Sequence, residues 1–205
     1  HPHRRRLHIR PFVRPSAQAT SIQRNRVQTN MGESRSELLA WLNEHLLTDG
    51  QPNKARVILF TEYRATHSWL MQILATSGWG GERLMVLHGG TDPDEREKIK
   101  AAFQSNPDDS AVRILLATDA ASEGIDLQNH CNYLIHVEIP WNPNVMEQRN
   151  GRIDRHGQKQ KQVFIWHPVG GGAVDATVAM KPGDITGDHE FLMRAVKKVD
   201  SIRQD

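Results

Sequence analysis

Five short apolar runs, separated by helix-like segments, constrain the fold of this chain more than any other feature. The first run, residues 56–61, reads Arg-Val-Ile-Leu-Phe-Thr and follows a turn-forming segment. Such a run predicts a strand that is buried on both faces, as in parallel sheets. The other four runs cover residues 84–88, 112–117, 133–137 and 163–166.

Helical periodicity fills the segments between these runs. A first helix is expected to start at Ser34 or Ser36, because a serine caps the amphipathic run that follows. Strands that alternate with helices and short loops predict an α/β domain with a mainly parallel sheet. The two helices expected inside the domain cover residues 65–76 and a segment from Asp92 (or Thr91) to about residue 104.

The two ends of the chain differ from its middle. Residues 1–30 contain seven arginines and no acidic residue, so the net charge of +2 divides into +7 there and −5 in residues 31–205. Prolines interrupt this first segment, and we expect residues 1–33 to be a basic arm or linker. Contact with nucleic acid and a linker cut from its context are both open interpretations. Residues 171–205 are expected to form an extension with one helix over 188–201.

Composition argues against several classes of protein and site. The one cysteine, Cys131, cannot form an internal disulfide, so a reducing, cytoplasmic setting is expected. No apolar run approaches the roughly 20 residues that span a membrane. The start of the chain lacks the apolar core of a signal peptide. The eleven histidines are scattered without zinc-site spacing, so no metal site is predicted.

Small, hydroxyl and acidic residues follow the predicted strands. In an open parallel sheet, ligands bind at the carboxyl ends of the strands, so these residues should share one rim. Each loop alone is also ordinary turn chemistry, but together they favour a rim that binds phosphate and ribose. The residues are Thr61, Glu62 and Tyr63 after the first strand, His88, Gly89, Gly90 and Thr91 after the second, and Thr118 to Asp126 after the third.

A basic segment, residues 148–158, follows the fourth predicted strand and its loop. On a helix, Gln148, Arg152 and Arg155 fall within roughly 60° of one another, so they are expected to share one face. Guanidinium is permanently charged, planar and bidentate towards phosphate. The row therefore suits a polyphosphate, and the alternative is a solvated basic face of a helix.

Four segments, taken in order, resemble helicase motifs. Residues 57–63 resemble motif IV, 88–103 the segment called IVa, 114–128 motif V and 148–158 motif VI. Their order and spacing resemble the second RecA-like lobe of superfamily 2 helicases. This resemblance implies a three-layer α/β/α domain, which we expect over residues 34–170.

Two details of these segments resemble particular branches of that superfamily. The ending Asp-Arg-His-Gly-Gln at residues 154–158 is similar to Snf2/Swi2-type DNA-dependent ATPases. The form Ser-Glu-Gly-Ile-Asp-Leu-Gln at residues 122–128 is similar to bacterial members of the RapA-like or phage-defence kind. The resemblance therefore implies a motor lobe that acts on duplex DNA.

The resemblance also implies roles for single residues. Arginine fingers that reach the ATP phosphates would be Arg152 and Arg155, with Gln148 ordering that site. The nucleotide edge would be lined by Gly124 and Asp126, the latter near the ribose, although Asp126 is also a plausible turn cap. The residues implied to grip a nucleic-acid backbone are Thr61, His88, Gly89 and Thr118; local capping is the alternative for Thr61 and His88.

Half of such an active site is missing from this sequence. It contains no Gly-x-x-x-x-Gly-Lys-Ser/Thr phosphate loop. We therefore expect ATP to be shared with, and Mg²⁺ to be held by, an absent N-terminal RecA-like lobe of the same polypeptide. The function expected is the second lobe of an Snf2-type ATP-dependent DNA translocase, inactive by itself. The alternatives are an RNA helicase lobe of the same superfamily and a non-enzymatic nucleic-acid-binding module.

Overall fold

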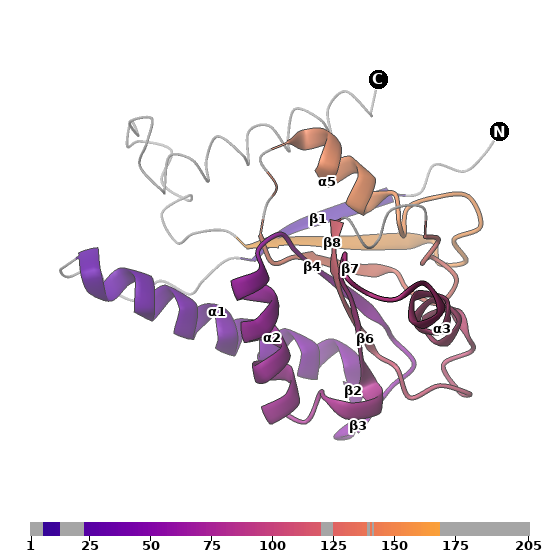
Figure 1. The fold of residues 1–205 in the computed structure, drawn as a ribbon, viewed down its shortest axis with the longest axis horizontal. Helices are drawn as coiled ribbons and strands as arrows, with labels where there is room; N and C mark the ends of the chain where they lie inside the picture. The colour runs from indigo at the N-terminus through magenta and orange to yellow at the C-terminus, as the bar shows by residue number, and fades with distance from the viewer. Residues whose placement is uncertain (1–5, 13–22, 120–124, 139, 141, 169–205) are drawn as a thin grey trace.

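The structure is a computed structural model, and it describes residues 6–12, 23–119, 125–138, 140 and 142–168 of the 205-residue chain. Within these residues the chain forms an α/β domain around one large sheet (Figure 1). The helix expected over residues 188–201 lies outside the described residues, as does Gly124.

The large sheet has six strands in the order β1-β8-β7-β4-β6-β5, and every pairing in it is parallel. Five of these strands are the five runs predicted from the sequence, with bounds that differ by one or two residues. A separate antiparallel pair, β2 (Leu47–Thr48) and β3 (Gln51–Pro52), lies between α1 and β4. The strands of the large sheet are β1 (Arg6–Phe12), β4 (Val57–Thr61), β5 (Leu84–Leu87), β6 (Ile114–Thr118), β7 (Tyr133–His136) and β8 (Gln162–Pro168).

Strand β4 lies between β6 and β7, and all five of its residues are buried. Its side chains alternate between two hydrophobic clusters, because successive residues of a strand point to opposite faces. Val57 and Leu59 belong to one cluster, and Ile58 and Phe60 belong to the other. The prediction of a strand buried on both faces is therefore confirmed.

Helices cover both faces of the sheet and complete three layers (Figure 1). The cluster on one face takes apolar side chains from α1 (Gln23–Leu46) and α2 (Arg64–Thr76). The cluster on the other face takes Ile99 and Phe103 from α3 (Pro93–Gln104). The predicted three-layer α/β/α architecture is confirmed.

Helix α3 begins where its sequence predicts. Asp92 is the N-cap, and its side chain accepts a hydrogen bond from the backbone N–H of Asp94 at 2.9 Å. Pro93 occupies the first turn, where a missing N–H costs nothing, and acidic residues there favour the positive end of the helix dipole. These local signals were sufficient to locate the start of the helix.

The expectation that regular structure begins at Ser34 or Ser36 was wrong. Strand β1 pairs in parallel with β8 from Arg6 to Phe12, and α1 already begins at Gln23. An edge strand needs only one partner and tolerates a proline such as Pro11, so its sequence signal is weak. Extending an existing helix is also much easier than nucleating one, so polar residues 23–33 can precede the apolar stripe.

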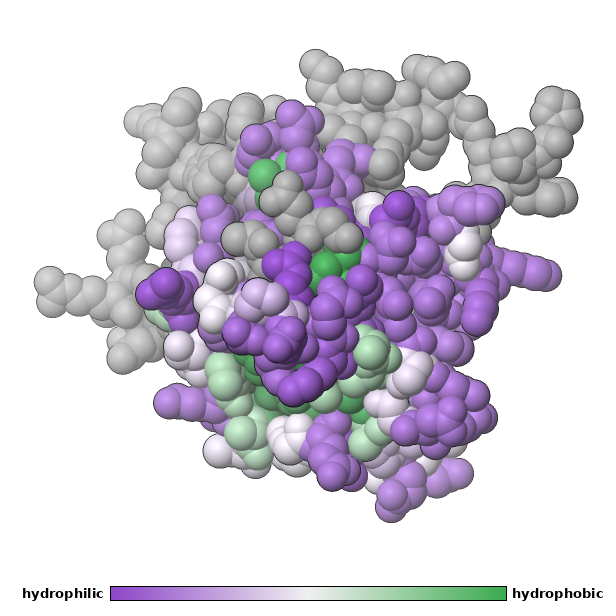
Figure 2. Space-filling view, turned by 45° about the vertical axis from the view of Figure 1, so that its right-hand side comes forward, coloured by the Kyte–Doolittle hydropathy of each residue, from purple (hydrophilic) through white to green (hydrophobic). Residues whose placement is uncertain are grey.

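The face shown in Figure 2 is mainly hydrophilic, with hydrophobic residues in the lower half of the view and smaller hydrophobic patches above them. Among the described residues, Tyr63 and Met71 are the exposed large hydrophobic side chains, with exposed fractions of 53% and 39%. No helix within the described residues is long and apolar enough to cross a membrane.

Candidate functional site

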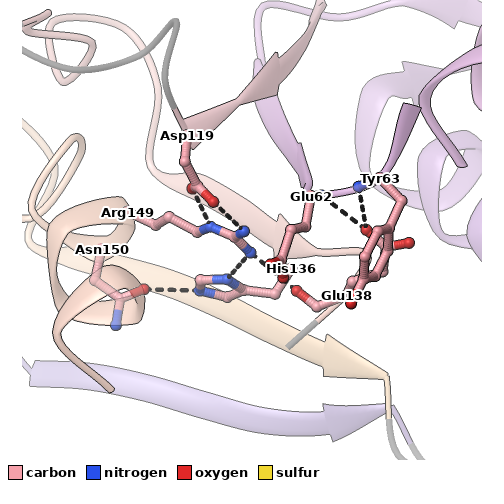
Figure 3. Close-up of polar contacts among 7 residues, drawn as sticks. All are labelled: Glu62, Tyr63, Asp119, His136, Glu138, Arg149 and Asn150. Atoms are coloured by element: carbon pink, nitrogen blue, oxygen red, sulfur yellow. Dashed lines mark hydrogen bonds and ion pairs between the residues drawn. The ribbon is translucent and has the colours of Figure 1, made fainter. Parts of the chain in front are cut away.

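The carboxyl ends of the parallel strands meet at one edge of the sheet, which we call the carboxyl edge. Asp119 follows β6 there, and Glu138 follows β7 by two residues. Helix α5 (Pro143–Asn150) brings Arg149 between them. Figure 3 shows these side chains converging from separate elements, with Glu62 and Tyr63 of the β4–α2 loop beside Glu138.

Arg149 is at the centre of this group and has an exposed fraction of only 1%. Its Nε and Nη2 donate to the two carboxylate oxygens of Asp119 at 2.5 and 2.7 Å. Its Nη1 donates to the carbonyl oxygen of Glu138 at 2.9 Å and lies 3.4 Å from Nδ1 of His136. The guanidinium also lies over the ring of Phe60, 5.4 Å from its centroid. A buried cation is tolerated because a carboxylate and further acceptors surround it.

The carboxylate of Glu138 caps the start of α2. One carboxylate oxygen accepts from the backbone N–H groups of Glu62, at 2.7 Å, and Tyr63, at 3.3 Å. The other accepts from the hydroxyl of Thr66. Tyr63, the N-cap residue, provides no side-chain cap of its own. A carboxylate from a different loop therefore satisfies donors at the helix N-terminus and complements its dipole.

The prediction that Gln148, Arg152 and Arg155 share a helix face was wrong. Helix α5 ends at Asn150, with Gly151 as its C-cap, and residues 151–157 form turns. Gln148 is on the helix, where it is exposed, and the two arginines are beyond its end.

Three tertiary contacts explain why the helix stops. The side chain of Asn150 is bound to His136, with Oδ1 at 2.9 Å from Nε2. The carbonyl oxygen of Arg152 accepts from the N–H of Leu127 at 3.2 Å, so it is engaged by another segment. Ile153 is fully buried in the cluster on the α3 face. Gly157 then adopts φ = 92°, which glycine reaches without strain.

The structure brings together Arg155, which was assigned as an arginine finger, and Asp126, which was assigned to the nucleotide edge. The guanidinium of Arg155 forms an ion pair with the carboxylate of Asp126, and the two side chains are 43% and 51% exposed. The side-chain amide of Gln104 donates to the backbone carbonyl of Asp126. Arg152, three residues before Arg155, is half-buried. Its backbone N–H donates to the backbone carbonyl of Arg149 at 3.0 Å.

The residues assigned to nucleic acid differ in their accessibility. Thr61 is fully buried, and its hydroxyl donates to the carbonyl of Tyr63 at 3.4 Å, so it presents no surface to a ligand in this structure. His88 and Gly89 are exposed, and Thr118 is half-buried at the end of β6. The local capping weighed for His88 is present, since its Nδ1 accepts from the N–H of Gly90 at 3.1 Å.

A buried histidine lies behind the His88 loop. His67, on α2, meets the ring of His88 edge-on, with centroids 5.9 Å apart. Burial lowers the pKa of His67, and the neighbouring His88 lowers it further. Among the described residues its Nε2 has no hydrogen-bond partner. The contact shows that the β4–α2 and β5–α3 connections are adjacent at the carboxyl edge.

Sequence reasoning missed three of the four residues at the centre of this site, His136, Glu138 and Arg149, and it placed Asp119 on the predicted rim without a role of its own. Two signals were available. His136 is a polar residue inside an otherwise apolar strand, which suggests a buried partner. Arg149 is adjacent to Gln148 but off the face that we considered, and on a helix the off-face residue is the one turned inward.

No cluster of three or more histidine, cysteine or acidic residues suited to a metal ion occurs in the part of the chain that the structure describes. Cys131 is buried at the opposite edge of the sheet, and burial raises the pKa of its thiol to about 12. Its Sγ donates to the carbonyl oxygens of Arg56 and Tyr133 at 3.2 and 3.3 Å. At neutral pH this thiol stays protonated, so it serves packing.

Residues 37–157 match the helicase conserved C-terminal domain. The chain belongs to this family. The match runs from α1 to the turn that follows α5, so it contains the whole carboxyl-edge site.

Several helicase-family proteins are similar in sequence. The chain is 39% identical over 112 residues to an uncharacterized ATP-dependent helicase, YqhH, of Bacillus subtilis, covering 55% of this chain and 18% of YqhH. It is 36% identical over 117 residues to the SNF2 domain-containing protein CLASSY 4 of Arabidopsis thaliana, covering 56% and 10%. It is 32% identical over 126 residues to the RNA polymerase-associated protein RapA of Pectobacterium atrosepticum, covering 61% and 12%. The resemblance to the Snf2 and RapA branch is confirmed, and the chain spans less than a fifth of each relative.

A solved structure supports the fold. Domain 2 of the DEAD-box helicase Mss116p, solved bound to an RNA duplex, superposes with a TM-score of 0.52 at 17% identity, covering 68% of this chain and 50% of that one. At this identity the likeness establishes the RecA-like fold alone.

Proposed function

We propose that this chain is the second motor lobe of an Snf2-type ATPase that moves along duplex DNA. In this proposal it closes on a first RecA-like lobe, which carries the phosphate loop that this sequence lacks. The observation that carries the proposal is the exposed Arg155–Asp126 pair at the carboxyl edge of a helicase C-terminal domain. In this pair, a guanidinium that could bind phosphate lies against a carboxylate that could bind ribose.

The residues present suit the phosphates of ATP, and the described part of the chain has no cluster of three or more histidine, cysteine or acidic residues that could hold a metal ion. Bound ATP with Mg²⁺ would supply the free energy of hydrolysis. Arg155 would leave Asp126 and stabilise the negative charge that develops on the transferring phosphoryl oxygens. Asp126 would then be free to accept from a ribose hydroxyl. Arg152, held by its backbone to Leu127 and Arg149, would provide a second guanidinium.

Nucleic acid would bind at the other side of the same edge. His88 and Gly89 are exposed there, and Thr118 is half-buried nearby. Because Thr61 is buried, we assign the accessible surface of its loop to Tyr63 and Arg64, which are both exposed. Arg64 can meet phosphate, and a tyrosine ring can pack on a sugar or base.

The decisive experiment concerns Arg155 in the longer protein that contains both lobes. Arg155→Ala should lower DNA-stimulated ATP turnover on the order of 10³–10⁵-fold while the protein stays folded, since an arginine finger acts mainly in the transition state. Arg155→Lys should restore little, because lysine lacks the planar fork. Arg83→Ala, which removes a guanidinium bound to the carbonyl of Gly78, is the matched control and should keep full turnover. Near-normal turnover in Arg155→Ala would exclude the finger assignment.

The nucleic-acid partner is tested with the 205-residue chain. Duplex DNA should bind weakly, without sequence preference, and with an affinity that falls steeply as salt rises, because phosphate contacts release counterions. Duplex RNA of the same length is the competing ligand. Tighter binding of RNA than DNA would favour an RNA helicase lobe, and ATP turnover by this chain alone would contradict the two-lobe proposal.

A further inference from the structure

Contacts between side chains and backbone run without a break across the carboxyl edge. At one end is the turn of residues 151–157, which carries Arg152 and Arg155. At the other end is the β4–α2 loop with Glu62 and Tyr63. Arg149 and Glu138 lie between these ends, and Figure 3 shows their contacts. Neither residue has a role in the function proposed above.

We propose that Arg149 and Glu138 are positioning residues that link the phosphate-facing turn to the nucleic-acid-facing loop. The identity of the two ligands rests on the proposed function, whereas the link itself rests on contacts within the described residues. It would make the position of each loop depend on the position of the other.

The turn is built on residues that are anchored to the sheet. The carbonyl of Arg149 accepts from the N–H of Arg152 at 3.0 Å, while the Arg149 side chain is bound to Asp119. The carbonyl of Asn150 accepts from the N–H groups of Ile153 and Asp154 at 3.2 and 2.9 Å. A displacement of Arg149 would therefore move the first residues of the turn.

The loop on the other side is held by a different part of Glu138. Its backbone carbonyl accepts from Arg149 at 2.9 Å, and its carboxylate holds the N–H groups of Glu62 and Tyr63. One residue therefore contacts Arg149 through its backbone and the loop through its side chain. Tyr63 is 53% exposed, so the loop held in this way reaches the surface.

The burial of Arg149 makes the link stiff. Side chains inside a protein interact more strongly than those in water, and a buried charge that loses its partner is strongly unfavourable. Arg149 is already desolvated, so leaving Asp119 would leave its charge buried and unpaired; it therefore stays bound or the loops move together. Thr66, whose hydroxyl also donates to Glu138, ties the first turn of α2 into the same group.

Amide hydrogen exchange in the 205-residue chain tests the link without any ligand. The reporters are the amides of Glu62 and Tyr63 for the loop, and those of Arg152 and Asp154 for the turn. Arg149→Lys keeps the charge but loses the forked contact, and it should raise exchange at the loop amides by about tenfold or more. Glu138→Gln replaces one carboxylate oxygen by an NH₂ group, and it should raise exchange at the turn amides, which Glu138 does not touch.

Two controls separate a link from general loosening. Arg56→Lys changes a buried arginine at the opposite edge of the sheet. In this variant, the exchange rates of the loop and turn amides, each divided by the rates of the β5 amides, should equal the wild-type ratios. Thr66→Val removes only one donor to Glu138, which preserves folding if Arg149→Lys does not fold, and it should raise exchange at the turn. Thr76→Val, whose hydroxyl donates to carbonyls at the far end of α2, should not.

Each result decides one claim. Exchange that rises at both ends in Glu138→Gln and Thr66→Val supports the link. Exchange that rises only at the amides in direct contact with the altered side chain overturns it. Failure of the wild-type chain to bind duplex DNA would overturn the proposed ligand of the loop and leave the exchange result to judge the link separately.

Discussion

Arg56 and Arg149 are both buried, at opposite edges of the same sheet, and they are held in different ways. Arg56 precedes β4, and its guanidinium donates to the carbonyl oxygens of Phe103, Ser105 and Val112 at 2.6, 2.6 and 3.0 Å. These acceptors are all backbone groups, from the end of α3 and the start of β6. Arg149 instead has a carboxylate, a carbonyl and an imidazole around it, from Asp119, Glu138 and His136.

The difference has an electrostatic consequence. Burial, together with the neighbouring Arg113, lowers the pKa of Arg56 to about 10. Arg113 is itself bound to carbonyl oxygens, including those of Ser110 and Pro107. At the amino edge, the side-chain hydrogen bonds of both arginines within the described residues therefore go to backbone carbonyls, although burial lowers the pKa of Arg113 and the charge of Asp108 acts to raise it.

The comparison suggests what each edge is for. Backbone acceptors do not change with a substitution or with a side-chain rotation. Arg56 therefore connects the end of α3 to the segment before β6 through contacts that belong to the fold itself. The groups around Arg149 come from three different segments, and two of them are side chains, those of Asp119 and His136. A network of side chains suits an edge of the sheet whose contacts rearrange. A network of backbone groups suits an edge whose contacts stay the same.

The largest effect is expected from removing the carboxylate of Asp119, which forms the ion pair with the buried Arg149. Asp119→Ala leaves Arg149 buried without its counter-ion, and loss of about 3–5 kcal/mol of unfolding free energy is expected for breaking such a pair. Urea unfolding of the 205-residue chain measures it. Asp108→Ala is the control, since its ion pair with Lys54 is exposed and worth about 0–1 kcal/mol. Equal losses in both variants would show that Arg149 is not held by Asp119.

An intermediate effect is expected at the amino edge. Arg56→Met fills much of the same volume but leaves buried carbonyls without their donor, which costs about 1–3 kcal/mol of unfolding free energy. Binding of duplex DNA by the folded chain should not change, because Arg56 is remote from the carboxyl edge. The same urea unfolding and a DNA titration check both statements. Weaker DNA binding at full folding would show that the two edges are not independent.

The smallest effect concerns pH. The pKa of His67 in the folded chain lies below its ordinary value of 6.5, so the unfolded chain binds a proton that the folded chain does not. Its contribution to stability is complete above pH 6.5 and declines as the pH falls below 6.5. His67→Gln should flatten this decline, measured as unfolding free energy at pH 7.5 and 5.5. Burial also lowers the pKa of His130, so some decline should remain in the variant.

An unchanged decline in His67→Gln would assign the acid sensitivity to other groups. His67 contacts His88 at the carboxyl edge, and His130 lies near Arg56 at the amino edge. The two substitutions therefore compare how much acid sensitivity each edge contributes. A larger flattening from His130→Gln than from His67→Gln would reverse the order expected from their burial.

The sequence by itself determined five of the six strands that the structure describes in the large sheet, together with helices α2 and α3. A strand such as β4 is mostly apolar because both of its faces are covered, and this pattern is visible in the four consecutive apolar residues 57–60. The start of helix α3 was predicted from Asp92 and Pro93, because capping and the fixed proline backbone are local effects. The motif order was also a property of the sequence, and it led to the family.

Tertiary structure alone decided which polar residues of the motifs are buried. Thr61 has no local signal that separates it from an exposed neighbour such as Tyr63, and helix periodicity places Arg149 off the face of Gln148 without indicating its partners. Their burial depends on β7 and α5 packing beside β4 and β6, which are distant in sequence. The end of α5 was decided in the same way, by contacts of Asn150 and Arg152 with other segments.

The edge strand β1 shows the same limit. Its backbone pairs with β8, more than 150 positions away in sequence, and no neighbouring residue reports that partner. Local patterns therefore predict elements whose stability comes from their own side chains. Elements and polar contacts whose partners are remote become visible only when the chain is folded, because the energy that selects them is shared between distant segments.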